Sequence, residues 1–280
     1  MICFMYPGQP LGREGAPEPS ADFEAIVSLT LDRTGLDISA WSWNSAIPSE
    51  NVALQVYGGA VSLYRTRVLA AEGRRPALAA EHSMGIYAAL AACGALDEGD
   101  CLELIARIGR ALAEMGTRAS YALGCVTGLP AAPLLAIAEE HGVFLANRNT
   151  SRHFLIAGTK AAVEEATAAS LTAGAFTART FPADAPLHTP LVEEIAPLLG
   201  EVVADYRFLE PQIPLMEHLG QDFLCAADIP GFLVRELCAP VNWEETYLAL
   251  RKRGVHQFVE TGCGESLRKY NRWISSERGV

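Results

Sequence analysis

A serine in the stretch AEHSMG, residues 80–85, is the first candidate for chemistry. Ser83 follows the short apolar run RPALAAE and precedes the helical pattern GIYAALAACGALD. A strand, a sharp turn and a helix N-terminus would present its hydroxyl at the edge of a parallel sheet, where helix N–H groups stabilise an oxyanion. The pattern resembles the nucleophile elbow G-x-S-x-G, with Glu81 in place of the first glycine. Taken alone, it favours a helix-capping serine over a nucleophile.

A serine nucleophile needs a base, and the sequence contains six histidines. His82 adjoins the serine, so its side chain should point elsewhere and pack. His141 ends an expected helix, where it suits the helix dipole, and His256 lies in a turn-to-strand segment. His188 lies in FPADAPLHTPLVEEI, where the chain returns from a small domain to a large one. Domain junctions form clefts, and His188 is therefore the candidate base.

The elements that must position these residues alternate between strands and helices. The run ICFMY ends in Pro-Gly and indicates a buried strand, and residues 51–73 have helical spacing. The segment DCLELIARIGRALAEMG predicts an amphipathic helix, whereas residues 11–50 are poorly periodic. After the middle of the chain, IPLMEHL predicts a strand, two helices follow near 228–239 and 243–253, and HQFVETG predicts a strand before a final helix.

Residues 120–183 have a pattern of their own. The segments YALGCVTGL, PAAPLLAIAEEHG, VFLANRN, HFLIAGT, KAAVEEATAASLTAGA and FTARTFP predict the order β-α-β-β-α-β. That order is ferredoxin-like. We therefore predict an α/β protein whose large domain, residues 1–119 and 184–280, has a parallel sheet and carries a ferredoxin-like small subdomain, residues 120–183, as an insertion.

Composition narrows the class of protein. The net charge of −11 argues against a nucleic-acid partner, which needs clustered Lys and Arg. Seven cysteines without C-x-x-C spacing indicate thiols of a reducing compartment rather than disulfides or a zinc site. No apolar run approaches the roughly 18 residues of a membrane span, and the N-terminal segment is too short for a signal peptide. We expect a soluble cytoplasmic protein with no membrane or metal partner.

Five segments, in order and at matching spacing, resemble the malonyl-CoA:acyl carrier protein transacylases and the acyltransferase domains of polyketide synthases. They are FMYPGQP, EHSMGIYAAL, ANRNTSRHFLIAG, FPADAPLHTPL and APVNWEETYLALRKRGVHQFVETGCG. The first, second, third and fifth of these segments resemble the family's F-P-G-Q-G, G-H-S-x-G-E-Y-A-A-L, A-N-x-N-S-x-x-Q-x-V-I-S-G and N-P-V-x-W…F-x-E-x-G-P-G, in that order. The fourth segment matches the stretch that contains the family's catalytic histidine. The resemblance covers nearly the whole chain and implies an α/β-hydrolase-like large domain with the inserted small subdomain.

The resemblance also implies a role for each matching residue. Ser83 would form an acyl-enzyme ester, and His188 would act first as its base and then as the acid for the departing thiolate. The backbone N–H groups of Gln9 and Met84 would form the oxyanion hole, and the backbone carbonyl of Asn242 would orient the histidine. The enzyme would then use a Ser-His dyad, with no permanently bound cofactor. Its substrates would be thioesters of CoA or of the phosphopantetheine arm of an acyl carrier protein.

One departure from the family concerns the acyl group. Malonyl enzymes of the family hold the substrate carboxylate with the arginine of an R-G-x-x-M pattern. Counting from Ser83 without a gap places Ile108 at that position. Arg107 and Arg110 are turned away on the helix by about 100° and 200°, which favours solvated side chains. A malonyl carboxylate beside isoleucine would be desolvated and unpaired. We therefore expect an uncharged acyl group.

Other residues complete the expected site. We place His82, Ile108, Leu187, Asn147 and His153 in the substrate pocket. Glu81 should have a negative φ and point away from an intact elbow, because a side chain at positive φ is strained. Local positive charge should dock the acidic carrier protein, and the two candidate clusters comprise Arg251, Lys252 and Arg253, and Arg268, Lys269 and Arg272.

Three functions remain open at this point. The first is an acyltransferase that moves a non-malonyl acyl group to or between carrier proteins in polyketide or related biosynthesis. The second is a hydrolase that uses the same dyad but lets water remove the acyl group from stalled carrier proteins. The third is a non-catalytic homologue kept as a docking module, for which Glu81 and Pro10 in the two loops near the oxyanion hole would argue.

Overall fold

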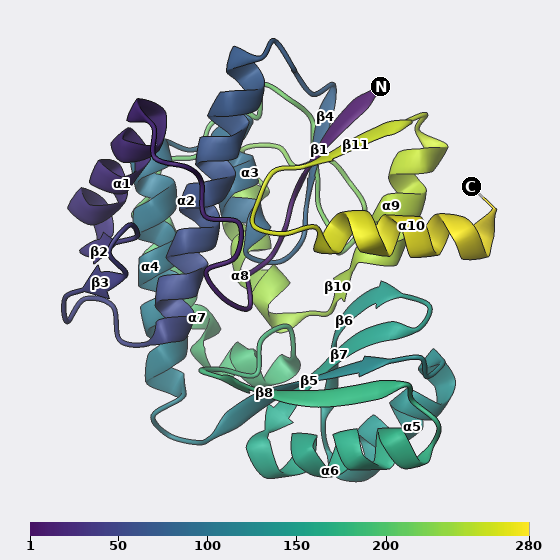
Figure 1. Ribbon diagram of the computed structural model, residues 1–280. Coiled ribbons are helices and arrows are strands. Elements are labelled where there is room, and N and C mark those ends of the chain that lie inside the picture. Colours follow the sequence, from purple (N-terminus) through teal and green to yellow (C-terminus); the bar gives the residue numbers. More distant parts are fainter. Residues whose placement is uncertain (280) are drawn as a thin grey trace.

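The computed structural model describes residues 1–279, and a parallel sheet lies at its centre (Figure 1). Its order is β11-β1-β4-β9, with β1 at Ile2–Tyr6, β4 at Leu78–Glu81, β9 at Leu215–Met216 and β11 at Gln257–Glu260. Strands β1, β4 and β9 are mainly apolar and buried, because both faces of the sheet are covered by helices. The expected strand IPLMEHL is reduced to two residues, since the Glu217 carboxylate accepts the N–H groups of Leu219 and Gly220 and turns the chain.

Two hydrophobic cores hold the sheet in place. One lies between the sheet and α2 (Glu50–Ala71), α3 (Gly85–Ala92) and α4 (Glu98–Met115), with α7 (Ala196–Ala204) and α8 (Ile229–Cys238) at its edge. The other lies under α9 (Trp243–Lys252) and α10 (Ser266–Arg278) on the opposite face (Figure 1). A 3₁₀ helix at Pro190–Ile195 precedes α7. These elements match the expected pattern over 51–115 and 228–279.

A helix that the sequence pattern did not reveal lies within residues 11–50. Helix α1 (Ala21–Thr34) begins after the capping Ser20 and ends at Gly35, and it is followed by the two-residue strands β2 (Leu36–Asp37) and β3 (Ser42–Trp43). Its buried face contains Thr30 and Thr34, whose hydroxyls bond back to main-chain carbonyls. Because threonines replace apolar residues on that face, the hydrophobic periodicity is weak.

The small subdomain has the predicted order of elements. Its elements are β5 (Tyr121–Thr127), α5 (Ala131–His141), β6 (Phe144–Thr150), β7 (His153–Thr159), α6 (Lys160–Thr172) and β8 (Thr177–Ala183). The strand order β6-β7-β5-β8 is antiparallel, and α5 and α6 cover one face. A further strand, β10 (Val241–Asn242), joins β6 from outside residues 120–183. The proposed boundaries of the two domains therefore stay a prediction.

Within residues 1–279, no helix combines the length and the apolar character that crossing a membrane requires.

Candidate active site

Ser83 sits on a sharp turn between β4 and α3. Its φ is 56°, a left-handed value that is strained for any residue other than glycine. The turn is possible because Gly85 follows: a Cβ there would lie 2.1 Å from the carbonyl oxygen of Tyr6. The side chain of Ser83 is thereby held at the carboxyl end of the parallel strands, with the N-terminus of α3 directly behind it.

His188 lies within hydrogen-bonding distance of the serine. Ser83 Oγ is 2.6 Å from His188 Nε2, and His188 Nδ1 is 2.7 Å from the carbonyl oxygen of Glu236. The carbonyl can only accept, so Nδ1 carries the proton and Nε2 is free to accept from the Ser83 hydroxyl. Burial lowers the pKa of His188 to about 3. The imidazole is therefore neutral near pH 7 and in the right tautomer to act as a base.

The carbonyl that orients His188 is that of Glu236, so the prediction for Asn242 is wrong. The Asn242 carbonyl instead accepts the Thr246 hydroxyl at the start of α9. The carbonyls of the last helical turn lack partners within a helix, and α8 ends at Cys238. The backbone carbonyls of Glu236 and Leu237 therefore point at His188. The Leu237 carbonyl accepts the backbone N–H of His188 at 2.8 Å. The Ala-Pro that follows α8 signalled this helix end in the sequence.

Glu81 leaves the elbow intact, as predicted. The non-glycine residues of 1–279 with positive φ are Trp41, Ser83, His188 and Gln221, so Glu81 has an ordinary strand conformation. Its carboxylate points away from Ser83 and bonds to His218, whose backbone N–H lies at 3.0 Å and Nδ1 at 2.7 Å. Neither residue is exposed.

The two N–H groups expected in the oxyanion hole are available. Met84 precedes α3, Gln9 lies in the loop after β1, and neither backbone N–H has an acceptor among residues 1–279. The Gln9 side chain holds its loop by donating to Asn51 at 3.3 Å and accepting from Gln55 at 3.1 Å. Two free donors beside a nucleophile are what an oxyanion requires. Their role stays a prediction.

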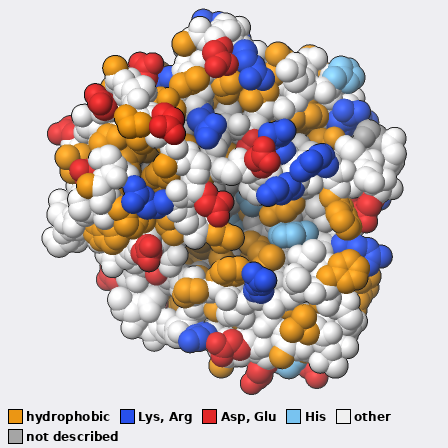
Figure 2. Space-filling view, in the orientation of Figure 1, with side chains coloured by type: hydrophobic (Ala, Val, Ile, Leu, Met, Phe, Trp, Pro, Cys, Tyr) orange, Lys and Arg blue, Asp and Glu red, His pale blue; other side chains and the backbone are white. Residues whose placement is uncertain are grey.

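A cavity of about 580 Å³ opens in front of the serine, between the two domains. Figure 2 shows hydrophobic side chains in the hollow and Lys and Arg side chains beside it. On the small subdomain, Leu123, Cys125, Leu155 and Phe181 form an apolar part of its wall, beside the polar side chains of Thr127, Asn147, Asn149, Thr150, Arg152 and His153. Lys269, Tyr270 and Trp273 also line it. An apolar chamber with basic residues at its edge suits an acyl chain attached to a phosphate-bearing arm.

Four of the five predicted pocket residues line this cavity: His82, Leu187, Asn147 and His153. The fifth, Ile108, does not, because its short side chain is 2% exposed and packs in the core beneath. A neighbour that sequence reasoning missed is Asn149. Its Oδ1 lies 2.8 Å from His82 Nε2, and its Nδ2 donates to His153 Nδ1 at 3.1 Å. Asn149 therefore joins the two histidines.

The arginines next to Ile108 are engaged elsewhere. Arg107 donates to Asp205 at 2.5 Å and to the Tyr206 hydroxyl, and Arg110 donates to the carbonyl of Ala46. Both bonds lie on the surface of the large domain. Neither guanidinium lines the cavity, in agreement with the expectation that both are surface groups.

The two basic clusters lie at different places. Lys269 of α10 lines the cavity, and Arg268 and Arg272 lie on the same helix. Arg253, just after α9, instead borders a separate hollow with Met1, which precedes β1, and with Leu78, the first residue of β4. The cluster of Arg251, Lys252 and Arg253 is therefore at the opposite edge of the sheet from Ser83.

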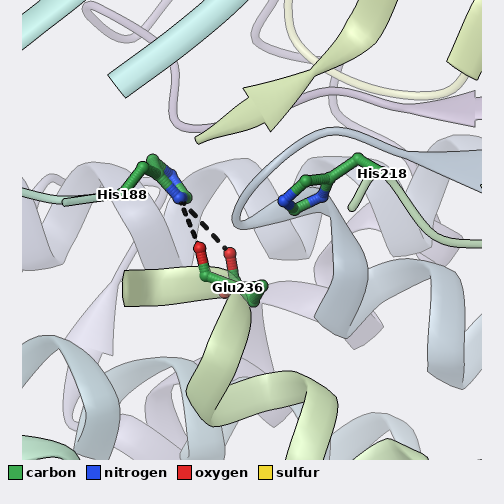
Figure 3. A group of neighbouring side chains, drawn as sticks. All are labelled: His188, His218 and Glu236. Carbon is green, nitrogen blue, oxygen red and sulfur yellow. Dashed lines mark hydrogen bonds and ion pairs between the residues drawn. The ribbon is translucent and has the colours of Figure 1, made fainter. Parts of the chain in front are cut away.

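The remaining reactive groups are the cysteine thiols and one group of side chains that could bind a metal ion. All seven cysteines lie in the described part of the chain and are free. His188, His218 and Glu236 bring nitrogen and oxygen atoms within 4.8 Å of one another (Figure 3). Both ring nitrogens of His188 already make hydrogen bonds, so a metal ion there would have to break the contact with Ser83 or Glu236. We do not interpret the group as a metal site, and the expected absence of a metal stays a prediction.

Comparisons with known proteins place this geometry in context. Residues 51–262 match the family model described as acyl transferase domain. The malonyl CoA-acyl carrier protein transacylase of Escherichia coli K12 is 30% identical over 95% of this chain and 90% of its own. An acyl carrier protein S-malonyltransferase from Vibrio cholerae superposes with a TM-score of 0.85 at 26% identity, covering 98% of this chain and 94% of its own. A malonyl-transacylase solved in complex with a type II PKS acyl-carrier protein gives 0.86 at 27% identity, covering 98% and 93%.

Proposed function

Because the chain belongs to the acyl transferase family, we propose that it moves an acyl group without a free carboxylate onto an acyl carrier protein through an acyl-Ser83 intermediate. The donor is a CoA or carrier-protein thioester, and the setting is polyketide or a related biosynthesis in the cytoplasm. The observation that carries the proposal is the 2.6 Å contact between Ser83 and His188 at the base of an apolar cavity.

The reaction follows from the positions of the atoms. His188 Nε2 takes the hydroxyl proton while Ser83 Oγ attacks the thioester carbonyl, and the N–H groups of Gln9 and Met84 receive the oxyanion. The tetrahedral intermediate collapses as His188 returns the proton to the departing thiolate. The thiol of the acceptor arm then gives its proton to His188 and attacks the ester, which regenerates the serine. No permanently bound cofactor takes part in these steps.

The expected acyl group follows from what surrounds it. Much of the cavity lining is apolar, Ile108 is buried below, and Arg107 and Arg110 are bonded at the surface. Arg152, the arginine that does line the cavity, already donates to the Gly128 carbonyl at 2.9 Å. A carboxylate in the apolar part of the chamber would therefore lose its hydration without gaining an arginine partner, at a free-energy cost of about 3 kcal/mol. The relatives named above carry malonyl in their names, so this chain would differ from them in the acyl group and not in the chemistry.

Arginine at position 108 tests this specificity. We expect the wild-type protein to load propionyl from its CoA thioester about 100-fold faster than malonyl, since an unpaired buried carboxylate costs about 3 kcal/mol. Ile108→Arg should narrow that ratio, because a guanidinium that extends from position 108 into the cavity would pair with the carboxylate. Ile108→Met is the control of similar length without charge and should leave the ratio unchanged.

Acyl-enzyme formation is read by intact-protein mass spectrometry, with thermal unfolding to confirm that each variant folds. Efficient malonyl loading by the wild type would contradict the proposal, and so would a folded Ile108→Arg variant with an unchanged ratio. Rapid release of the acid from acyl-carrier thioester with no acceptor present would instead identify a hydrolase.

Charge reversal in α10 tests the docking face. Lys269→Glu should raise the KM for acyl carrier protein about tenfold at low salt and leave kcat unchanged, because Lys269 lies at the cavity and the carrier is acidic. The effect should diminish at high ionic strength. Lys252→Glu is the matched control at the opposite edge of the sheet and should leave KM unchanged. Equal effects of the two substitutions would show that only net charge matters.

A further inference from the structure

A row of buried ionisable side chains lies behind His188, on the Nδ1 side of its ring (Figure 3). Glu236 Oε2 is 3.6 Å from His188 Nδ1, and the His218 ring stands nearly perpendicular to that of His188 with centroids 6.2 Å apart. Glu81 completes the row through its bonds to His218. Glu81, His218 and Glu236 are all 0% exposed. We call these three residues the buried acid–histidine row.

The hydrogen bonds within this row are unevenly distributed. Glu81 accepts the backbone N–H and the Nδ1–H of His218. In contrast, His218 Nε2 and both carboxyl oxygens of Glu236 have no partner among residues 1–279. Buried polar atoms are rarely left unpaired, and one ring nitrogen of His218 lies within 4.8 Å of a carboxyl oxygen of Glu236. A rotation of the Glu236 carboxyl, or one buried water, would join the two side chains.

The charge in the row follows from those bonds. Burial raises the pKa of both Glu81 and Glu236; the Glu217 carboxylate raises the pKa of Glu81 further, and the Glu81 carboxylate raises that of Glu236. The pair therefore holds at most one negative charge near neutral pH. The Glu81 carboxylate accepts two hydrogen bonds from His218, whereas the Glu236 carboxyl has no partner among residues 1–279, so a single negative charge on the pair resides on Glu81. Glu236 keeps its proton and can donate it to His218 Nε2.

We propose that Glu81, His218 and Glu236 form a proton relay that supplies His188 with a counter-charge during the reaction. As His188 Nε2 takes the proton of Ser83, the Glu236 carboxyl gives its proton to His218 Nε2, and the His218 Nδ1 proton passes to Glu81. Two protons shift along the row and none is gained or lost. The negative charge moves from Glu81 to Glu236, beside the His188 imidazolium, and returns when His188 protonates the leaving thiolate.

The relay addresses a weakness of a Ser-His dyad. A backbone carbonyl orients the histidine but stabilises its imidazolium less than a carboxylate does. A permanently ionised Glu236 would be a buried charge without donors, whereas the relay charges it only while His188 is positive. Glu81, which replaces the glycine of the elbow motif, is thereby a positioning residue that acts on the nucleophile through His218, Glu236 and His188. This inference rests on the acyl transfer proposed above.

Other titratable groups lie near the buried acid–histidine row, and their titration must be distinguished from that of the row. His82, beside the serine, has its pKa lowered by burial to about 4, and burial raises the pKa of Cys238 to about 11. Tyr87 of α3 and Cys101 of α4 have pKa values raised by burial. The Glu217 carboxylate accepts the backbone N–H groups of Leu219, Gly220 and Asp222. Glu217 also acts on the row, because its carboxylate adds to the rise that burial causes in the pKa of Glu81.

The pH dependence of acylation tests the relay. Single-turnover acylation is measured from pH 5 to 9 with whichever straight-chain acyl-CoA, from acetyl to octanoyl, loads the wild type fastest. A carboxyl with a raised pKa is protonated at low pH and ionises as the pH rises, so the wild-type rate should increase as the row gains its charge. Glu81→Gln and Glu236→Gln should each abolish that increase and lower the rate at pH 8 by about 10- to 100-fold. This is less than the roughly 10⁴-fold loss of a triad carboxylate, because the Glu236 carbonyl remains.

A double substitution and a matched control make the test decisive. The double variant Glu81→Gln/Glu236→Gln should acylate no more slowly than either single variant, since each substitution alone already disables the same relay. Glu244→Gln also removes a fully buried carboxyl, but one paired with Arg278, and should leave the pH profile unchanged. Folded variants that keep the wild-type profile, or losses that multiply in the double variant, would overturn the relay. Absence of any acyl-enzyme in the wild type would instead refute the proposed function.

Discussion

Ser83→Ala abolishes the covalent acyl adduct, and His188→Gln slows its formation by about 10³- to 10⁴-fold. The first loss is complete because alanine has no atom to carry the ester. The second is large because the nucleophile then has no base, and residual activity comes from the oxyanion hole and from substrate binding. Stopped reactions followed by intact-protein mass spectrometry measure both effects, and peptide mapping locates the adduct.

His153→Gln provides the comparison for the base. The His153 side chain also lines the cavity, but it forms a hydrogen bond with Asn149 rather than with Ser83. We expect its acylation rate to stay within about threefold of the wild type, because no proton of the reaction passes through it. An adduct on Ser83→Ala, or equal losses for the two histidine variants, would contradict the dyad.

Gly85→Ala disrupts the elbow itself. The added Cβ would lie 2.1 Å from the Tyr6 carbonyl oxygen and 2.7 Å from that of Pro7. Both contacts are with backbone, so either α3 or β1 must move. We expect a loss of about 3 kcal/mol in the free energy of unfolding, measured by urea denaturation, together with loss of acylation because Met84 and Ser83 move with α3.

Gly200→Ala is the matched control for this substitution. Gly200 lies inside α7, and an added Cβ would meet nothing within 4 Å. Alanine there should stabilise the protein by about 0.5–1 kcal/mol through its helix propensity and leave acylation unchanged. A Gly85→Ala variant as stable and active as the wild type would show that the turn does not depend on this close approach.

The sequence predicted those parts of the fold that follow from periodicity. The strands and helices around Ser83 and the whole β-α-β-β-α-β order alternate clearly enough to be located, and the resemblance identified Ser83 and His188. Helix α1 escaped because threonines occupy part of its buried face. Strand β10 was not predicted because two residues are too few to show a periodicity, and only its pairing with β6 defines it.

The parts of the site that could not be predicted depend on backbone groups and on residues far apart in the chain. Which carbonyl faces His188 is decided by the exact end of α8; the Ala-Pro after the helix indicates that it ends there, but not which carbonyl meets the imidazole. His218 gave no signal of its own, because its role depends on Glu81, 137 residues away. That Ile108 occupies the position of the family's arginine stays a prediction, and whether its side chain reaches the cavity depends on side-chain length and packing.

The central claim is that Ser83 carries an acyl group without a carboxylate. The most direct measurement incubates the wild-type protein and Ser83→Ala with a mixture of acetyl-, propionyl-, butyryl-, hexanoyl- and malonyl-CoA in equal amounts and weighs the intact protein. We predict a mass increase from an uncharged acyl group on the wild type alone, mapped to the peptide with Ser83, and little or no malonyl adduct. A dominant malonyl adduct on Ser83 would contradict the account of the acyl group, and no adduct on Ser83 from any donor would contradict the account of the chemistry.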